Sequence, residues 1–414
     1  MASPFSGSTV NPHRTGIAQR LHHADRSGRI GVLWPDLPLT ARWEAHGRVA
    51  AAVAAVLVGA TPHHLDDGGI PRAMGLAAFL GGVAPLLGSW CDQGAIATTP
   101  ALHTLLTEHL RHGRAAALRR RQAWTTVHRA FRSHGVTSVT LKGMHTGATL
   151  FAEPGVRPAH DVDVLIAPTA LPAAQRALTA AGLTEVPGSA VVTRSDWVWP
   201  GGSSVPRSVE MLHGDDPIRI DLHTSLRRTG AAGRLVGLDV AGPDDSEPCA
   251  ALGPEARVLR QPLLTAYLAF HAGAHFPAIP LIRLVELVLL VRRDGPDWGA
   301  VLDRLTRDHA VRYAYPTLVY AERLAPATIP TNTLRTLHGA ASPYLRRLVA
   351  RTDPGRALHT SAGVWPSVLA FAEGPRDVLW TLANRVFRPS THGWRDTLRI
   401  YRRRVSRLVA PDTA

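Results

Sequence analysis

The clearest hydrophobic pattern in the chain lies between residues 136 and 167. Residues 136–141 form a β-branched and apolar run, which predicts a buried strand. Lys142 and Gly143 interrupt this run, and a short helix is expected over residues 144–151. A second apolar strand is expected over residues 161–166, with acidic residues at its start.

The pattern continues as an α/β core over residues 136–230. A helix is expected over 168–181, with Thr169 as its N-cap and Gly182 as its C-cap, followed by a strand near 183–186. Residues 187–205 read as a loop. The runs 208–213 and 218–223 then predict a β-hairpin around the polar residues 214–217.

Helical periodicity dominates both flanks of this core. We therefore predict an α+β fold: a small mixed-sheet core flanked by N- and C-terminal helical domains. The expected parts are a disordered arm (1–40), a helical N-terminal region (41–135), the core (136–230), a helical C-terminal domain (255–352) and a helical basic tail (353–414).

Within the N-terminal region, residues 49–60 are too short an apolar run to span a membrane and predict a buried helix. Residues 74–90 predict a buried helical hairpin, and residues 100–135 predict two helices. Arg119, Arg120, Arg121 and Arg129 are expected on a solvated face, or else near a polyanionic substrate.

Net charge and cysteine content add expectations about partners and location to the predicted fold. The formal charge of +14 favours polyanions such as nucleotides, nucleic acid or anionic membrane, unless it reflects a general bias toward arginine. The basic amphipathic tail, residues 376–409, packs on its own domain or touches membrane or acidic partners. Two cysteines make neither a disulfide framework nor a zinc site, so a cytoplasmic location is expected.

Three aspartates supply the candidate chemistry. Asp161 and Asp163 are two apart on one strand and therefore share a face. Adjacent carboxylates repel each other unless a cation lies between them, and Mg²⁺ prefers such oxygen ligands. Asp221 lies in another short strand, which suits metal-assisted phosphoryl or nucleotidyl transfer. The alternative is that all three are acids at strand ends.

The segments LKG, RPAHDVDVLI, AAGL and IDLH together resemble the family of uncharacterised nucleotidyltransferases, in the DNA polymerase β-like superfamily. The resemblance extends over about residues 75–390, and its specific part is residues 141–166 and 221–223. It implies Mg²⁺-dependent transfer of a nucleoside monophosphate from an NTP to an acceptor. It also implies that Asp161, Asp163 and Asp221 are the catalytic and metal-binding residues.

The resemblance further implies that Lys142, Gly143 and Arg157 bind the nucleotide. The chain departs from the superfamily's Gly-Ser turn, because Met144 follows Gly143. Lys142 would contact phosphate or face solvent at a strand end. Arg157 would pair with phosphate or with Asp161.

Several other polar residues each allow two interpretations, one at the site and one structural. His223 would lie behind the metal ligands or be a hydrogen-bonded core histidine. His271, His275, Arg283 and Glu286 would line the acceptor side, or Arg283 and Glu286 would form a buried pair that holds two helices together.

The acceptor is expected to be a small molecule, a peptide or a protein, with peptide natural-product biosynthesis as one setting. Nucleic acid is a possible but less favoured partner. Two other functions remain open: a toxin–antitoxin-type nucleotidyltransferase that acts on RNA, and a non-catalytic scaffold that binds nucleotide or peptide.

Overall fold

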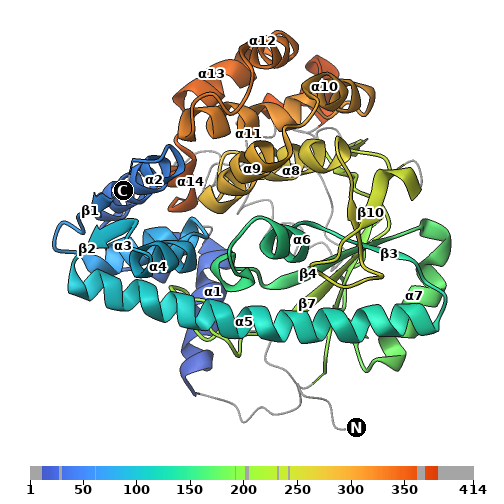
Figure 1. The fold of residues 1–414 in the computed structure, drawn as a ribbon, viewed down its shortest axis with the longest axis horizontal. Coiled ribbons are helices and arrows are strands. Elements are labelled where there is room, and N and C mark those ends of the chain that lie inside the picture. The colour runs from blue at the N-terminus through green and yellow to red at the C-terminus, as the bar shows by residue number, and fades with distance from the viewer. Residues whose placement is uncertain are drawn as a thin grey trace.

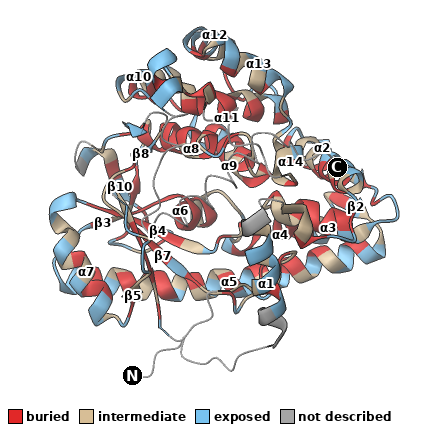
Figure 2. Ribbon diagram, turned by 180° about the vertical axis from the view of Figure 1, so that it is seen from behind, coloured by how far each residue is buried: buried red, intermediate tan, exposed pale blue. Residues whose placement is uncertain are grey.

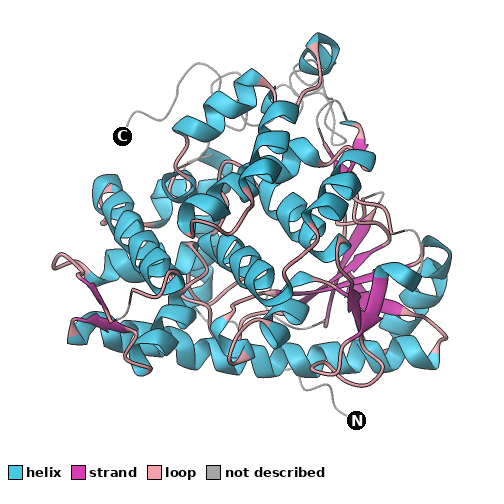
Figure 3. Ribbon diagram, turned by 45° about the horizontal axis from the view of Figure 1, so that its top comes forward, coloured by secondary structure: helices cyan, strands magenta, loops and turns pink. Residues whose placement is uncertain are grey.

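The computed structural model describes residues 12–27, 30–60, 62–191, 193–200, 205–230, 233–240, 243–360 and 369–380. A mixed seven-stranded sheet lies beside one long helix, and two groups of shorter helices complete the molecule (Figures 1 and 3). The α+β fold is therefore confirmed, with a small mixed sheet flanked by N- and C-terminal helices.

The strands of the sheet are arranged in the order β10, β11, β3, β4, β7, β6, β5. Their bounds are Ser246–Pro248, Arg257–Leu259, Ser138–Thr140, Asp161–Ile166, Arg219–His223, Arg194–Val198 and Thr184–Glu185. The central strand β4 runs parallel to β7 and antiparallel to β3. Two short pairs lie outside this sheet: β1 with β2 (His63–Leu65 and Ile96–Thr98) and β8 with β9 (Arg228–Thr229 and Leu235–Val236).

The predicted hairpin over residues 208–223 is wrong. Strand β7 pairs with β4 and β6, and residues 208–213 form no strand. The carboxylate of Asp216 accepts hydrogen bonds from the backbone amides of Arg207 and His213, each at 2.7 Å. These bonds close a loop where a second strand was expected, and β6 occupies residues expected to be a loop.

The two faces of β4 meet different helices. Val162, Val164 and Ile166 pack in one core with residues of α5 (Pro100–Ser133) and α7 (Leu171–Ala180). Leu165 belongs instead to the core that contains the C-terminal helices. Because side chains alternate along a strand, Asp161 and Asp163 lie on this second face.

Helix α7 begins after the 3₁₀ turn Pro168–Ala170, so Thr169 is not its N-cap. Gly182 follows the helix with a φ of +82°, as expected of a C-terminal glycine.

Helix α5 is a single 34-residue helix where two were expected. At 1.5 Å per residue it is about 51 Å long, and Figure 1 shows it running under the whole molecule. Gly113 lies within it because the short 3₁₀ helix η2 (Pro154–Val156) packs against this point. A Cβ atom at Gly113 would lie 2.4 Å from the carbonyl oxygen of Gly155.

The N-terminal helices are α1 (Pro12–Ser27), α2 (Leu39–Leu57), α3 (Pro71–Leu80) and α4 (Ala84–Asp92). Helix α1 lies where a disordered arm was expected. The predicted buried helix over 49–60 and the hairpin over 74–90 correspond to α2 and to α3 with α4. Among the described residues, no single helix is long and apolar enough to cross a membrane. Only α3 and α4 counted together, across a 117° bend, meet the length and composition criteria.

The sheet is followed by the helices α8 (Leu263–Gly273), α9 (Leu281–Asp294), α10 (Trp298–Arg307), α11 (Val311–Leu324), α12 (Thr331–Ala340), α13 (Pro343–Arg351) and α14 (Pro354–Leu358). Buried residues of α8 to α13 belong to one core cluster with those of the N-terminal helices, and Figure 2 colours the buried residues of both groups red. The amide of Ile282 donates to the carbonyl of Gly81 at 2.9 Å across this junction. Most of the predicted basic tail, residues 381–414, lies outside the described residues.

Candidate active site

The parallel pairing of β4 with β7 places Asp163 directly beside Asp221. Both carboxylates are buried, with 1% and 5% of their surface exposed. His223 lies two residues further along β7, and the ligand atoms of these three residues lie within 4.8 Å of one another. Two strands distant in sequence therefore form one cluster of potential metal ligands.

Asp163 is held by two nitrogen donors on one of its oxygens. Its Oδ1 lies 2.9 Å from Lys142 Nζ and 3.0 Å from His223 Nε2. Burial alone would raise the pKa of Asp163, but Lys142 and His223 outweigh it and hold that pKa well below its usual range. Asp163 is therefore ionised at neutral pH.

Lys142 is the only lysine in the chain. It is the first residue of α6 (Lys142–Thr149), which begins two residues earlier than expected. With 5% of its surface exposed, Lys142 does not face solvent, so that alternative is wrong. Its Nζ also lies 3.3 Å from Nε2 of His271 on α8, which links the sheet to the C-terminal helices.

Asp221 has a different environment from Asp163. Its Oδ2 lies 3.4 Å from Nη1 of Arg194, a half-exposed residue on β6. Burial, together with the nearby negative charges of Asp163 and Asp161, raises the pKa of Asp221 to about 7. Asp221 therefore exchanges its proton near neutral pH.

One oxygen of each central carboxylate is buried without a hydrogen-bond donor among the described residues: Oδ2 of Asp163 and Oδ1 of Asp221. Buried polar atoms without a partner are uncommon and costly. Carboxylate oxygens are the ligands that Mg²⁺ prefers. The residues present therefore fit a divalent cation held by Asp163 and Asp221. His223 contacts Asp163 and would orient that carboxylate.

Asp161, the third predicted ligand, begins β4 and is half-buried. It shares the face of Asp163 but does not belong to the three-residue cluster around Asp221, and its strand partner is Arg219. Its role in metal binding stays a prediction.

Sequence reasoning missed Asp196 and Arg194, because their strand was expected to be a loop. Asp196 is 5% exposed and pairs in register with Asp221 across β6 and β7. The Nε atom of Arg194 lies 3.1 Å from Asp196, so this guanidinium bridges the two carboxylates. The aromatic run around Trp197 was the available signal for a strand.

Arg157, predicted to bind the nucleotide or to pair with Asp161, does not pair with Asp161 but with Glu286 in this structure. It is 2% exposed and binds Glu286 on α9 through two contacts, from Nε at 2.8 Å and from Nη2 at 3.3 Å. Arg283 Nη1 also donates to Glu286, at 3.1 Å. The expected Arg283–Glu286 pair is present, but both residues lie on one helix, so it does not join two helices.

Gly143, the other residue predicted at the nucleotide, is the second residue of α6. A Cβ atom at this position would lie 2.8 Å from Nη1 of Arg157, so the glycine allows Arg157 to approach the helix closely. This packing gives Gly143 and Arg157 a structural role. Their contact with a nucleotide stays a prediction.

The model of the family described as "Uncharacterised nucleotidyltransferase" matches residues 76–326, which include α5, the sheet and most of the C-terminal helices. The chain belongs to this family, and the family indicates nucleotidyl transfer with an NTP as donor. No curated protein and no solved structure is significantly similar to the chain.

Proposed function

We propose that the protein transfers a nucleoside monophosphate from an NTP to a hydroxyl-bearing acceptor in a Mg²⁺-dependent reaction. The observation that carries the proposal is the pair Asp163 and Asp221, in register on adjacent strands, each with one buried oxygen that accepts no hydrogen bond from the described residues. Membership of the nucleotidyltransferase family supplies the reaction class.

In this proposal Asp163 and Asp221 hold the cation, and Asp161 extends the acidic face toward it. When bound, Mg²⁺ would neutralise charge on the reacting phosphate and lower the pKa of the attacking hydroxyl. Lys142 and Arg194 already lie at these carboxylates and would balance the negative charge of the nucleotide.

The reaction forms a bond between the acceptor oxygen and the α-phosphorus and breaks the bond from that phosphorus to the bridging oxygen. Pyrophosphate leaves. The hydroxyl proton passes to solvent with the help of Asp221, which stays deprotonated while it holds the cation. We propose a small molecule, a peptide or a protein as acceptor, with a modified peptide as the first to test.

Thermal stability tests the donor site, because a ligand that binds only the folded state raises the melting temperature. Each of the four NTPs is added with and without Mg²⁺ to wild type, to Asp163→Asn and to Asp303→Asn. Asp303 is an exposed residue on α10 and provides the matched control. We expect a Mg²⁺-dependent rise in wild type and in the control that is absent from Asp163→Asn.

Transfer itself is tested with an α-labelled NTP and candidate acceptor pools, with pyrophosphate release as the second readout. Nucleotide binding without transfer to any pool would favour a scaffold. Loss of the labelled product on RNase treatment would identify RNA as the acceptor. A melting-temperature rise that survives in Asp163→Asn would reject the carboxylate site.

A further inference from the structure

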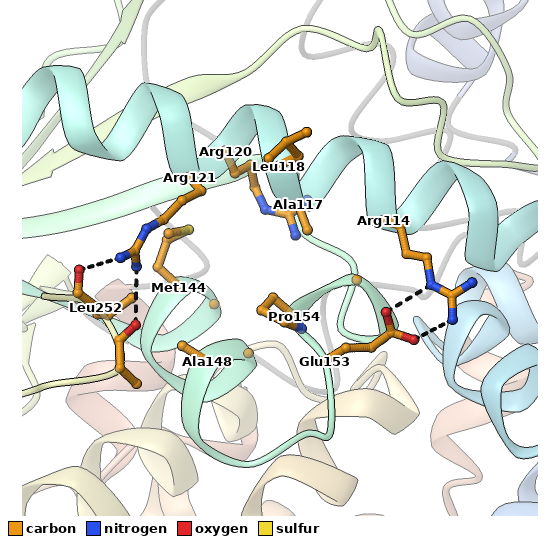
Figure 4. Close-up of a pocket in the computed structure, with 14 residues that line it drawn as sticks. Arg114, Ala117, Leu118, Arg120, Arg121, Met144, Ala148, Glu153, Pro154 and Leu252 are labelled. Atoms are coloured by element: carbon orange, nitrogen blue, oxygen red, sulfur yellow. Dashed lines mark hydrogen bonds and ion pairs between the residues drawn. The ribbon is translucent and has the colours of Figure 1, made fainter. Parts of the chain in front are cut away.

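A cavity of about 380 Å³ lies between α5 and the segment formed by α6 and η2. None of Asp161, Asp163 and Asp221 lines it, so it is separate from the acidic cluster, although Gly143 forms part of its wall. Figure 4 shows three arginines of α5 on one side, Arg114, Arg120 and Arg121, with Met144 and Pro154 opposite them. The cavity thus combines apolar walls with positive charge.

Arg120 is the unusual member of this set. It is 3% exposed, where the sequence suggested a solvated side chain. Its Nη1 donates to the carbonyl of Ala159 at 2.6 Å, and its Nη2 donates to that of Arg157 at 3.4 Å. Its Nε has no hydrogen-bond partner, and no acidic side chain of the described residues lies within ion-pair distance.

Carbonyl groups satisfy hydrogen bonds but carry no net charge, so they do not neutralise Arg120. Burial, with a smaller contribution from the positive charge of Arg157, lowers the pKa of Arg120 to about 10, and the negative charge of Asp161 only partly opposes this. A buried charge with no carboxylate in direct contact is strongly unfavourable.

The other cavity charges do not supply the missing anion. Glu153, the only acidic residue in the lining, already binds Arg114 through two contacts of 2.7 and 2.8 Å. Arg121 donates to the carbonyl of Leu252 at 2.6 Å and also lacks a carboxylate. The lining therefore carries three positive charges against one negative charge.

We propose that this cavity binds a small organic anion, a carboxylate attached to an apolar body. The carboxylate would be drawn to Arg120 and Arg121, and the apolar part would pack on Met144, Leu118 and Pro154. The volume is that of a small-molecule site. Arg120 also donates to backbone carbonyls of the segment just before β4. An occupant that binds Arg120 would therefore contact a residue that positions this strand.

The test uses the full chain and a matched pair of probes, 3-phenylpropionate and its neutral amide, with binding measured by displacement of anilinonaphthalene sulfonate fluorescence. We expect the carboxylate to bind wild type at least about tenfold more tightly than the amide, a difference of about 1.4 kcal/mol. Equal binding of the two probes, or no binding of the carboxylate, would overturn the proposal.

Variants locate the site. Arg120→Gln removes the charge, and Ala117→Phe fills the cavity from a half-buried position on α5. Both should weaken binding of the carboxylate about tenfold or more. Gln122→Phe adds the same ring at an exposed position of α5 outside the lining and should bind as wild type does.

Ala117→Phe keeps the proposal testable if Arg120→Gln does not fold. Wild-type affinity in Ala117→Phe would reject the cavity. Asp163→Asn should keep its affinity for the carboxylate, because the cavity is separate from the acidic cluster. Loss of binding in Asp163→Asn would assign the probe to the active site instead.

Discussion

Asp163 and Asp221 are neighbours on two strands, yet their surroundings move their pKa values in opposite directions. Lys142 and His223 keep Asp163 ionised, whereas burial and adjacent negative charge raise the pKa of Asp221 to about 7. Pairs of acids with separated pKa values are typical of sites that divide roles between them. Here Asp163 would hold a cation permanently, and Asp221 would bind it only after losing a proton.

Metal binding should therefore depend on pH. Below about pH 7 Asp221 carries a proton that a cation must displace, so the affinity for Mn²⁺ or Mg²⁺ should fall by up to about tenfold per pH unit. Calorimetric titrations at pH 8, 7 and 6 measure this. In Asp221→Asn the dependence should vanish. A wild-type affinity that stays constant from pH 6 to 8 would contradict the raised pKa.

Glu286 should be among the residues on which stability depends most. It is fully buried and binds both Arg157 and Arg283, so Glu286→Gln removes the carboxylate partner of buried Arg157 and of partly buried Arg283. We expect a loss of about 3–5 kcal/mol in the free energy of unfolding, measured with urea.

The matched control is the exposed pair Arg132–Glu255. Glu255→Gln should change the free energy of unfolding by less than about 1 kcal/mol. Equal changes in the free energy of unfolding for the two substitutions would mean that the burial of Glu286 does not determine how much it stabilises the fold.

At the scale of single residues, the sequence correctly indicated the acidic residues of the candidate site. The D-x-D pattern and Asp221 identified the acidic strands, and Asp163 and Asp221 do lie together. Arg157 could not be placed, because its partner Glu286 is 129 residues away and an arginine in a loop matches phosphate and carboxylate equally well.

At the scale of elements, helix α5 depends on glycine at a point where another segment approaches. Gly113→Ala should lower stability although alanine is the better helix former, because the added Cβ would lie 2.4 Å from the Gly155 carbonyl. Gly47 in α2 has no atom within 4 Å of such a Cβ. Gly47→Ala should therefore raise stability by up to about 1 kcal/mol.

Thermal unfolding of both variants checks this prediction. The melting temperature should fall in Gly113→Ala and rise in Gly47→Ala. A gain in both would show that η2 can move away from α5 at little cost. A loss in both would show that helix propensity does not govern Gly47.

Periodicity predicted most helices but failed where contacts between elements decide the outcome. Residues 100–135 were predicted to form two helices, whereas they belong to one helix in which Gly113 is a contact point. Strand β6 has only five residues and is half of an antiparallel pair with β7. Short strands of this kind are defined by their partners more than by their own sequence.

At the scale of the whole molecule, the N- and C-terminal helices meet at a buried pair of histidines. His46 on α2 and His359 after α14 lie 3.4 Å apart between ring nitrogens. Burial lowers the pKa of His46 to about 4 and that of His359 to about 3. Both imidazoles are therefore neutral in the folded chain at pH 6, whereas the unfolded chain binds protons near pH 6.5.

The unfolded state thus holds more protons between about pH 6.5 and 4, so the free energy of unfolding should fall as the pH is lowered through this window. His359→Gln should reduce the slope by up to about 1.4 kcal/mol per pH unit. Urea titrations of both proteins at pH 7.5, 6 and 5 measure it. Other buried histidines, His109 and His145, keep part of the slope in the variant. Identical slopes would show that His359 does not contribute to the acid sensitivity.

Sequence patterns did not predict this long-range contact between the N- and C-terminal helices. The N- and C-terminal helices were expected as separate parts, yet their apolar faces form one core from Trp34 to Leu345. Hydrophobic periodicity shows which face of a helix is buried but not which other helix covers it.

If the protein binds a cation as proposed, the position of Lys142 has a consequence for how that cation is loaded. The ammonium group gives Asp163 a positive partner within the chain itself, at 2.9 Å. Under the proposed function, Asp163 would therefore be neutralised before a cation arrives, and loading would exchange one positive charge for another. Availability of the ion would then decide when the protein is active and leave its abundance unchanged.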